Sequence, residues 1–233
     1  MFRSHSDAIR ETVRTRWRQM ITVELMDPRI TDYAKPLCDM LSWYDPALFT
    51  ATENRSIQQW IVRSRDFLMT QSFGPSALHP TSNWQFYRLW ALSVMGVILK
   101  QPANIQFLRQ EFRKALAASI SPADGSLEDF RERDAVEYHV YCLYAIIRTI
   151  RALGPAYHST DGTIVWGGVD LWPDAKPAID FMMRYARGEA THIEFVDSRL
   201  AVDRQRSEYG KLFIPSKCDY VLRELWDAGY MIA

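Results

Sequence analysis

Cysteine is scarce in this 233-residue sequence, which contains only Cys38, Cys142 and Cys218. An odd number of cysteines with no CxxC or CxxH spacing argues against a disulfide framework and against a structural zinc site. The five histidines lack the paired spacing typical of metal ligands, and no glycine-rich phosphate loop or serine-nucleophile elbow is present. We therefore expect neither a metal nor another cofactor, and we expect the thiols to be buried or spare.

An excess of charge is also missing, because 28 Lys and Arg residues balance 28 Asp and Glu residues. The net charge therefore gives no reason to expect a nucleic acid or an anionic membrane as a partner. The most apolar stretch, residues 89–99, is only about half the length that a membrane-spanning helix needs. The segment MFRSHSDAIRETVRTRWRQM at the amino terminus lacks the apolar run of a signal peptide. We expect a soluble protein with no export signal in this chain.

Helical periodicity is abundant in this chain, and its 48% hydrophobic residues suffice for a large core. Residues 83–99 are apolar on every face, which is typical of a helix packed on several sides. Apolar spacing predicts further helices over residues 9–20, 57–68, 105–116, 133–150, 177–187 and 215–226. Only residues 162–172 have strand character, and Asp124-Gly125 predicts a turn between helices. We expect one all-α domain over residues 1–233, built as a layered helical assembly.

Three segments carry a resemblance to a known family: SNWQFYRLWALSV (82–94), DGSLEDFRERDAVEYHVYCL (124–143) and RYARGEATHIEFVDSRLAVDR (184–204). Together they resemble the alginate lyase family of polysaccharide lyases and the related glucuronan lyases, most clearly over residues 55–228. The resemblance is centred on a Tyr-His-x-Tyr motif that follows an Asp-Gly turn. It implies an α/α toroid of antiparallel helix hairpins, incomplete in this short chain, and relatives that are often periplasmic or secreted.

The activity that the resemblance implies is metal-independent β-elimination in a β-linked uronic-acid polymer, either mannuronan (alginate) or glucuronan. This reaction needs a group that neutralises the uronate carboxylate, a base that removes the proton on C5, and an acid that protonates the leaving glycosidic oxygen. In mannuronate and glucuronate chains the proton and the leaving oxygen lie on the same side of the ring. One tyrosine can therefore act as both base and acid.

The resemblance also implies roles for individual residues. Asn83 falls on the family asparagine that neutralises the carboxylate, and Tyr141 matches the family tyrosine that transfers the protons. His139 and Arg133 are expected to assist. Trp84 replaces the family histidine, which favours the glucuronan-type relatives and offers a surface for stacking on a sugar. The candidates for substrate binding are Trp84, Tyr87, Arg88, Tyr138 and His192.

Each of these residue types has a structural alternative. Asparagine is a favoured helix N-cap, and a pair of tyrosines such as Tyr138 and Tyr141 can pack in a core with satisfied hydroxyls. His139 can be a structural histidine, and Arg133 a solvated surface charge. Two other functions stay open: a non-catalytic carbohydrate-binding or degenerate lyase domain, and a helical interaction module. If the lyase interpretation is right, Asn83 and Tyr141 should lie on different helices and face one concave cleft.

Overall fold

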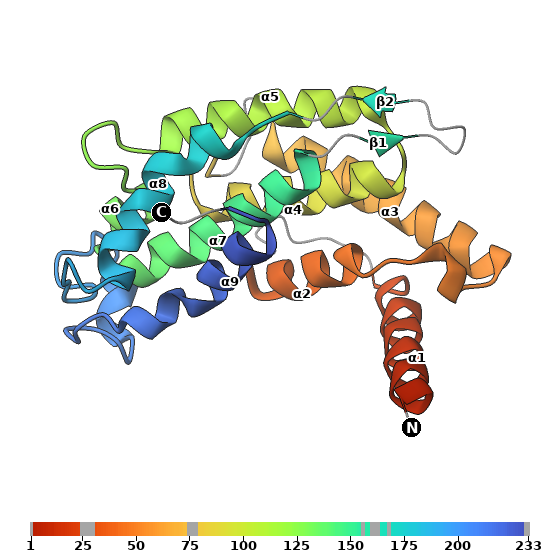
Figure 1. The fold of residues 1–233 in the computed structure, drawn as a ribbon, viewed down its shortest axis with the longest axis horizontal. Coiled ribbons are helices and arrows are strands. Elements are labelled where there is room, and N and C mark those ends of the chain that lie inside the picture. Colours follow the sequence, from red (N-terminus) through yellow and green to blue (C-terminus); the bar gives the residue numbers. More distant parts are fainter. Residues whose placement is uncertain are drawn as a thin grey trace.

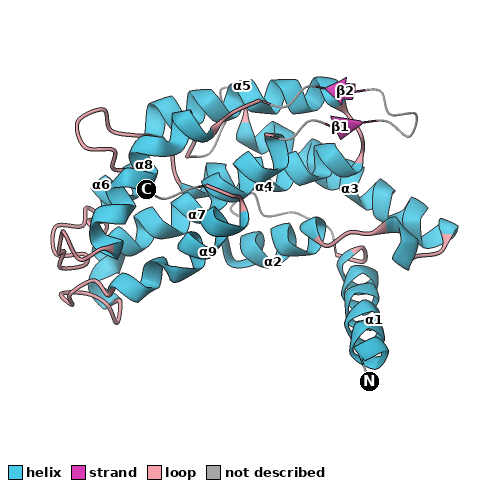
Figure 2. Cartoon of the chain, in the orientation of Figure 1, coloured by secondary structure: helices cyan, strands magenta, loops and turns pink. Residues whose placement is uncertain are grey.

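The computed structural model describes residues 2–23, 31–73, 79–154, 157–158, 164–166 and 169–230, and helices dominate them (Figures 1 and 2). The α-helices in these ranges are α1 (Phe2–Met20), α2 (Thr31–Ser42), α3 (Ala51–Ser72), α4 (Asn83–Ile98), α5 (Pro102–Ser119), α6 (Glu128–Arg133), α7 (Val136–Leu153), α8 (Trp172–Ala186) and α9 (Asp219–Asp227). Three 3-10 helices accompany them, η1 (Pro46–Leu48), η2 (Ala201–Gln205) and η3 (Pro215–Cys218). The all-α prediction is confirmed, whereas the toroid and the single domain stay predictions.

The helices α4 and α7 form the centre of the fold and make its most extensive helix–helix contact (Figure 1). Helices α2, α3 and α5 pack around α4, while α6, α8 and α9 pack against α7. The apolar residues on every face of α4 explain this central place, because each face meets a neighbouring helix. The helix predicted over residues 83–99 is therefore confirmed.

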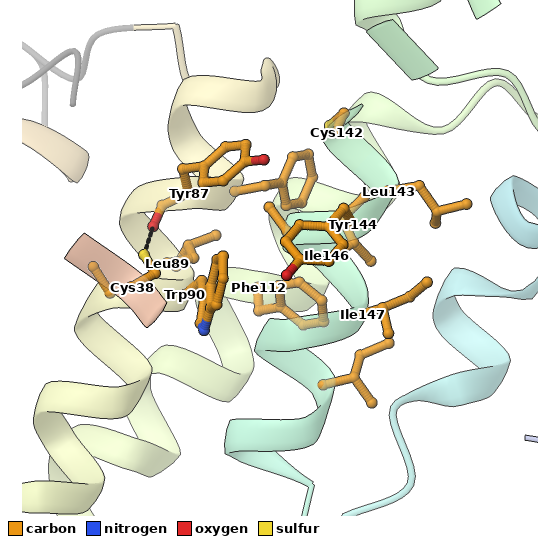
Figure 3. Packing of buried hydrophobic residues seen from close by; sticks show 14 of the residues in the cluster. Cys38, Tyr87, Leu89, Trp90, Phe112, Cys142, Leu143, Tyr144, Ile146 and Ile147 are labelled. Carbon is orange, nitrogen blue, oxygen red and sulfur yellow. Dashed lines mark hydrogen bonds between the residues drawn. The ribbon is translucent and has the colours of Figure 1, made fainter. Parts of the chain in front are cut away.

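Large side chains fill the space between the two central helices (Figure 3). Trp90 of α4 meets Tyr144 of α7 edge to face, with ring centroids 5.6 Å apart. The Cys38 thiol donates a hydrogen bond to the Tyr87 carbonyl at 3.7 Å. All three cysteines are buried, as the sequence predicts. Each large apolar side chain buried here stabilises the fold by ~1.5–3 kcal/mol.

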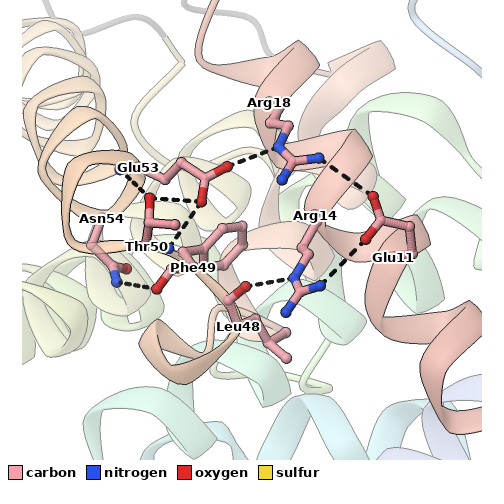
Figure 4. Close-up of polar contacts among 8 residues, drawn as sticks. All are labelled: Glu11, Arg14, Arg18, Leu48, Phe49, Thr50, Glu53 and Asn54. Carbon is pink, nitrogen blue, oxygen red and sulfur yellow. Dashed lines mark hydrogen bonds and ion pairs between the residues drawn. The ribbon is translucent and has the colours of Figure 1, made fainter.

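The amino-terminal helix α1 is anchored through its second half (Figure 4). Trp17 is 0% exposed and packs edge-on against Tyr44 and Trp60, and Arg18 Nε donates to the Glu53 carboxylate at 2.9 Å. Ile9 is 65% exposed, so the predicted apolar stripe is wrong at that residue. The apolar spacing continues beyond the part of the helix that meets the rest of the protein.

The predicted helix over residues 133–150 is interrupted near its start. Arg133 ends α6, and Asp134 adopts a left-handed conformation with φ of 51° before α7 begins at Val136. The Glu194 carboxylate accepts hydrogen bonds from the backbone N–H groups of Val136 (3.0 Å) and Glu137 (3.3 Å). It thereby satisfies N–H groups that have no partner within a helix. Glu194 therefore fixes where α7 starts.

The remaining elements agree with the sequence in part. The strands β1 (Tyr157–His158) and β2 (Ile164–Trp166) pair antiparallel, which confirms strand character within residues 162–172, although 162–163 and 167–168 lie outside the described residues. Helix α8 begins at Trp172, five residues before the predicted start at residue 177. Its first turn contains Pro173, and proline is compatible with the first turn of a helix. Gly125, with φ of 83°, lies in the predicted turn between α5 and α6. In the described ranges, we find no helix with the length and apolar character needed to span a membrane.

Candidate functional site

A pocket of about 370 Å³ lies beside the first turns of α7. It is lined by three tyrosines, two basic residues, one acidic residue and one valine: Tyr138, Tyr141, Tyr220, Arg206, Lys217, Glu137 and Val140. Its volume is in the range of ordinary small-molecule sites. The pocket therefore brings phenolic hydroxyls, aromatic surfaces and positive charge together.

Tyr138 lies in a cationic environment within this pocket. Arg206 Nη2 donates a hydrogen bond to the Tyr138 hydroxyl at 2.5 Å. The Arg133 guanidinium carbon lies 3.9 Å from the centroid of the Tyr138 ring, and that of Arg206 lies 5.0 Å away. Burial raises the pKa of Tyr138 above its usual value, and the charges of the two arginines act in the opposite direction. The hydroxyl is therefore protonated near neutral pH, and a cation is already in contact with it.

Both arginines are held by one buried carboxylate. Asp203 is 0% exposed and accepts hydrogen bonds from Arg133 Nε (3.0 Å), Arg206 Nε (2.8 Å) and the Ser198 hydroxyl (2.6 Å). Arg133 Nη2 also donates to it. Burial acts to raise the pKa of Asp203, but the hydrogen bonds from Arg133, Ser198 and Arg206 outweigh it, and the pKa lies below its usual value. Asp203 is therefore ionised and compensates the charge of the arginine pair in part.

Tyr141, the expected proton-transfer residue, lies on the wall of the same pocket and is partly buried. Its ring centroid is 4.8 Å from that of Tyr87 and 6.4 Å from that of Tyr138. Lys217 Nζ forms an ion pair with Glu137 at the same pocket. The structure thus brings Tyr138 and Tyr141 together, and it adds a lysine that the sequence did not point to.

Asn83 is not among the residues that line this pocket. It is 4% exposed, and both its backbone N–H and its side-chain amide donate to the Asp129 carboxylate at 2.6 Å. Burial raises the pKa of Asp129 to about 7, against the hydrogen bonds from Asn83 and Cys142. The expectation that Asn83 and Tyr141 face one cleft is therefore not met, because Asn83 is engaged in linking α4 to α6.

His139 lies in the core, away from solvent. It is 0% exposed; its Nδ1 accepts a hydrogen bond from the Leu127 N–H at 3.2 Å, and its Nε2 lies 2.9 Å from the Ala178 carbonyl. Nε2 therefore carries the proton and donates to that carbonyl. Burial lowers the pKa of His139 to about 4, so the ring is neutral. The structural alternative describes His139 better than the expected catalytic role.

The other expected substrate-binding residues are dispersed. Tyr87 and Arg88 are fully buried, Trp84 packs edge-on against His79, and His192 contacts the Asp134 carboxylate at 3.2 Å. Of the sequence candidates, Tyr138 and Tyr141 line the pocket, and Arg133 touches it through the Tyr138 ring.

The sequence did not point to Arg206, Lys217 and Tyr220, which line the pocket, or to Asp203, which lies behind it and binds Arg206. Asp203 and Lys217 lie in the 3-10 helices η2 and η3, Arg206 directly follows η2, and Tyr220 is the second residue of the short helix α9. Such segments have no long apolar period, and the run DRQR (203–206) is only a short cluster of charge.

Comparison with known proteins identifies the family. The family described as Alginate lyase matches residues 5–192, whereas no curated protein and no solved structure matches the sequence. The family consists of polysaccharide lyases, which implies an acidic polysaccharide as substrate. The resemblance noted in the sequence is thus confirmed over most of the chain. The protein belongs to the alginate lyase family and is an enzyme of the polysaccharide lyase class.

Proposed function

We propose that the protein cleaves a β-linked uronic-acid polymer, mannuronan (alginate) or glucuronan, by β-elimination in the pocket beside α7. The observation that carries this proposal is the hydrogen bond from Arg206 to the Tyr138 hydroxyl inside a pocket that also contains Lys217. A tyrosine in contact with an arginine suits this reaction because the phenolate that must form is stabilised by a charge-assisted hydrogen bond.

Tyr138 transfers the proton in this mechanism. Its phenolate removes the proton from C5 of the uronate, and the electron pair released forms the C4–C5 double bond as the bond from C4 to the glycosidic oxygen breaks. The Tyr138 hydroxyl, now protonated again, gives its proton to that oxygen. A single residue suffices because both groups lie on the same side of a mannuronate or glucuronate ring.

Positive charge in the pocket neutralises the substrate carboxylate. Arg206 and Lys217 supply it, in the role that the resemblance implied for Asn83, whose amide is already bound to Asp129. An electrostatic donor that faces the developing enolate lowers the barrier, because it is oriented before the reaction begins. The rings of Tyr141 and Tyr220 offer aromatic surfaces on which a sugar can stack.

We assign proton transfer to Tyr138 rather than to Tyr141 because the two arginines lie against the Tyr138 ring. Tyr141 instead packs against the buried ring of Tyr87. The two residues lie on one helix and share one pocket, so each is a matched control for the other.

The test is to incubate the purified protein with alginate, polymannuronate and glucuronan and to follow the absorbance of unsaturated uronate. Tyr138→Phe should lower turnover by ~10² to 10⁴-fold while oligosaccharide binding persists, since it deletes only the acid–base hydroxyl. Tyr141→Phe should cost much less turnover. The reverse pattern would move the role to Tyr141. Binding without product on any polymer would reject the lyase mechanism in favour of a degenerate, carbohydrate-binding protein.

A further inference from the structure

The buried carboxylate of Asp203 serves two arginines at once, although it does not line the pocket itself. Ser198 is the third residue that donates to this carboxylate, and it fixes the carboxylate within its own segment of chain. Each guanidinium lies against the Tyr138 ring. Asp203 therefore belongs to the pocket only through the residues that it holds.

Two guanidinium groups against one ring repel each other unless a carboxylate compensates them. The Arg206 side chain is 36% exposed, so solvent competes for it, while Asp203 is fully buried and cannot follow it outward. A fork-shaped guanidinium can bind a carboxylate through one edge and still direct another N–H elsewhere. Arg206 does this, because Nε donates to Asp203 while Nη2 donates to Tyr138.

We infer that Asp203 is a positioning residue that holds Arg133 and Arg206 against Tyr138, so that Arg206 can donate its hydrogen bond to the Tyr138 hydroxyl. The inference rests on the proposed function for its catalytic meaning. The geometric part concerns only where the two arginines lie, so it can be tested whether or not the protein cleaves a given polymer.

A titration separates this inference from a purely structural role. The charged groups with the largest effect on Tyr138 are Arg133 and Arg206, which lower its pKa, and Asp203 and Asp129, which raise it; Glu137 and Lys217 line the same pocket. If Asp203 were only a nearby negative charge, Asp203→Asn would lower the pKa of Tyr138. If Asp203 holds the arginines in place, the same change releases both cations, and the pKa of Tyr138 rises. The two explanations predict opposite signs.

The experiment measures the pKa of Tyr138 from the ultraviolet absorbance of tyrosinate as the pH is raised. For each protein the absorbance of its Tyr138→Phe counterpart is subtracted, which leaves the titration of Tyr138 alone. We expect an upward shift in Asp203→Asn. We expect the pKa of Tyr138 to rise in Asp203→Glu as well, because this variant keeps the charge but moves the carboxylate by one methylene. Asp203→Glu replaces Asp203→Asn in the experiment if Asp203→Asn does not fold. A downward shift or an unchanged pKa in the variant that folds would overturn the inference.

Asp134→Asn is the matched control. Asp134 accepts a hydrogen bond from the Asp197 N–H and so anchors the same segment of chain, without a hydrogen bond to either arginine. The pKa of Tyr138 should stay unchanged in this variant, and a shift as large as that of Asp203→Asn would assign the effect to loosening of the segment.

Turnover provides a second measurement if the wild-type protein yields unsaturated product. Asp203→Asn should then lower kcat more than it raises KM, and most of this loss should disappear in an Arg206→Met background, because interacting residues are not additive. Equal losses in both backgrounds would overturn the inference. If the wild-type protein yields no product, the proposed function fails, and the titration still decides the role of Asp203.

Discussion

The buried carboxyl group of Asp129 gives a prediction for how stability depends on pH. Asp129 is buried, and it joins α6 to the start of α4 through two hydrogen bonds from Asn83. Because burial raises its pKa from 3.8 to about 7, the folded protein holds this proton more tightly than the unfolded chain does. Stability must therefore fall as the pH rises through the interval between these two values.

The size of the effect follows from the shift in pKa. A difference of about three units at 1.36 kcal/mol per unit corresponds to about 4 kcal/mol once the pH exceeds both values. At pH 5 the folded carboxyl is still protonated and the penalty is only about 1.6 kcal/mol. Asp129→Asn keeps the size of the side chain and removes the charge, so its stability relative to the wild type should improve from pH 5 to about pH 7 and level off by pH 8.

Urea denaturation of both proteins at several pH values measures this difference. His139 titrates in the opposite sense, because burial lowers its pKa to about 4, and Glu194 titrates in the same sense as Asp129, with its pKa raised to about 7. Both groups are present in the two proteins and cancel in the comparison. The reasoning would be refuted if the difference in the free energy of unfolding between the two proteins stayed constant from pH 5 to pH 8. It would also be refuted if Asp129→Asn lost stability relative to the wild type as the pH rose.

Three other predictions use the same physical arguments. Gly125→Ala should destabilise the protein by about 2–5 kcal/mol in thermal denaturation, because Gly125 has a φ of 83° and an added Cβ would lie 2.2 Å from the Pro177 carbonyl oxygen. Gly188→Ala is the control: Gly188 has a φ of 71° but open space around it, so this change should cost only about 1 kcal/mol. The kcat/KM should rise with pH above neutrality by up to about tenfold per pH unit, because burial raises the pKa of Tyr138 and only its phenolate can act as the base. A flat pH profile would contradict the assignment of Tyr138 as the base. Trp17→Ala should cost ~3–5 kcal/mol in urea denaturation, because it empties the contact that anchors α1 to Tyr44 and Trp60, and a loss below 1 kcal/mol would contradict that anchoring.

The sequence predicted the central helix α4 well because burial on every side is visible in its composition. It did not predict the break between α6 and α7, since the carboxylate that caps α7 belongs to Glu194, 58 positions after Val136. No local pattern contains such a contact, and Asp134 in a left-handed conformation has no apolar signature.

The candidate site could likewise be predicted only where local sequence carried the signal. The resemblance and the Tyr-His-x-Tyr spacing pointed to Tyr138 and Tyr141, which share the pocket. Local spacing did not distinguish a buried histidine from a catalytic one, and the structural alternative for His139 was the better one. For Asn83 the structural alternative, a helix N-cap, does not describe the side chain either: a capping side chain accepts a backbone hydrogen bond, whereas this amide donates to Asp129.

The pocket unites parts of the chain that the ribosome makes at different times. Arg206 follows its partner Tyr138 by 68 positions, and Lys217 follows Glu137 by 80. Because synthesis runs from the amino terminus, α4 and α7 leave the ribosome well before either cation exists. A nascent chain can thus bury its central aromatic residues while the pocket still lacks Arg206 and Lys217. The proposed reaction centre is therefore among the last parts of the protein to form.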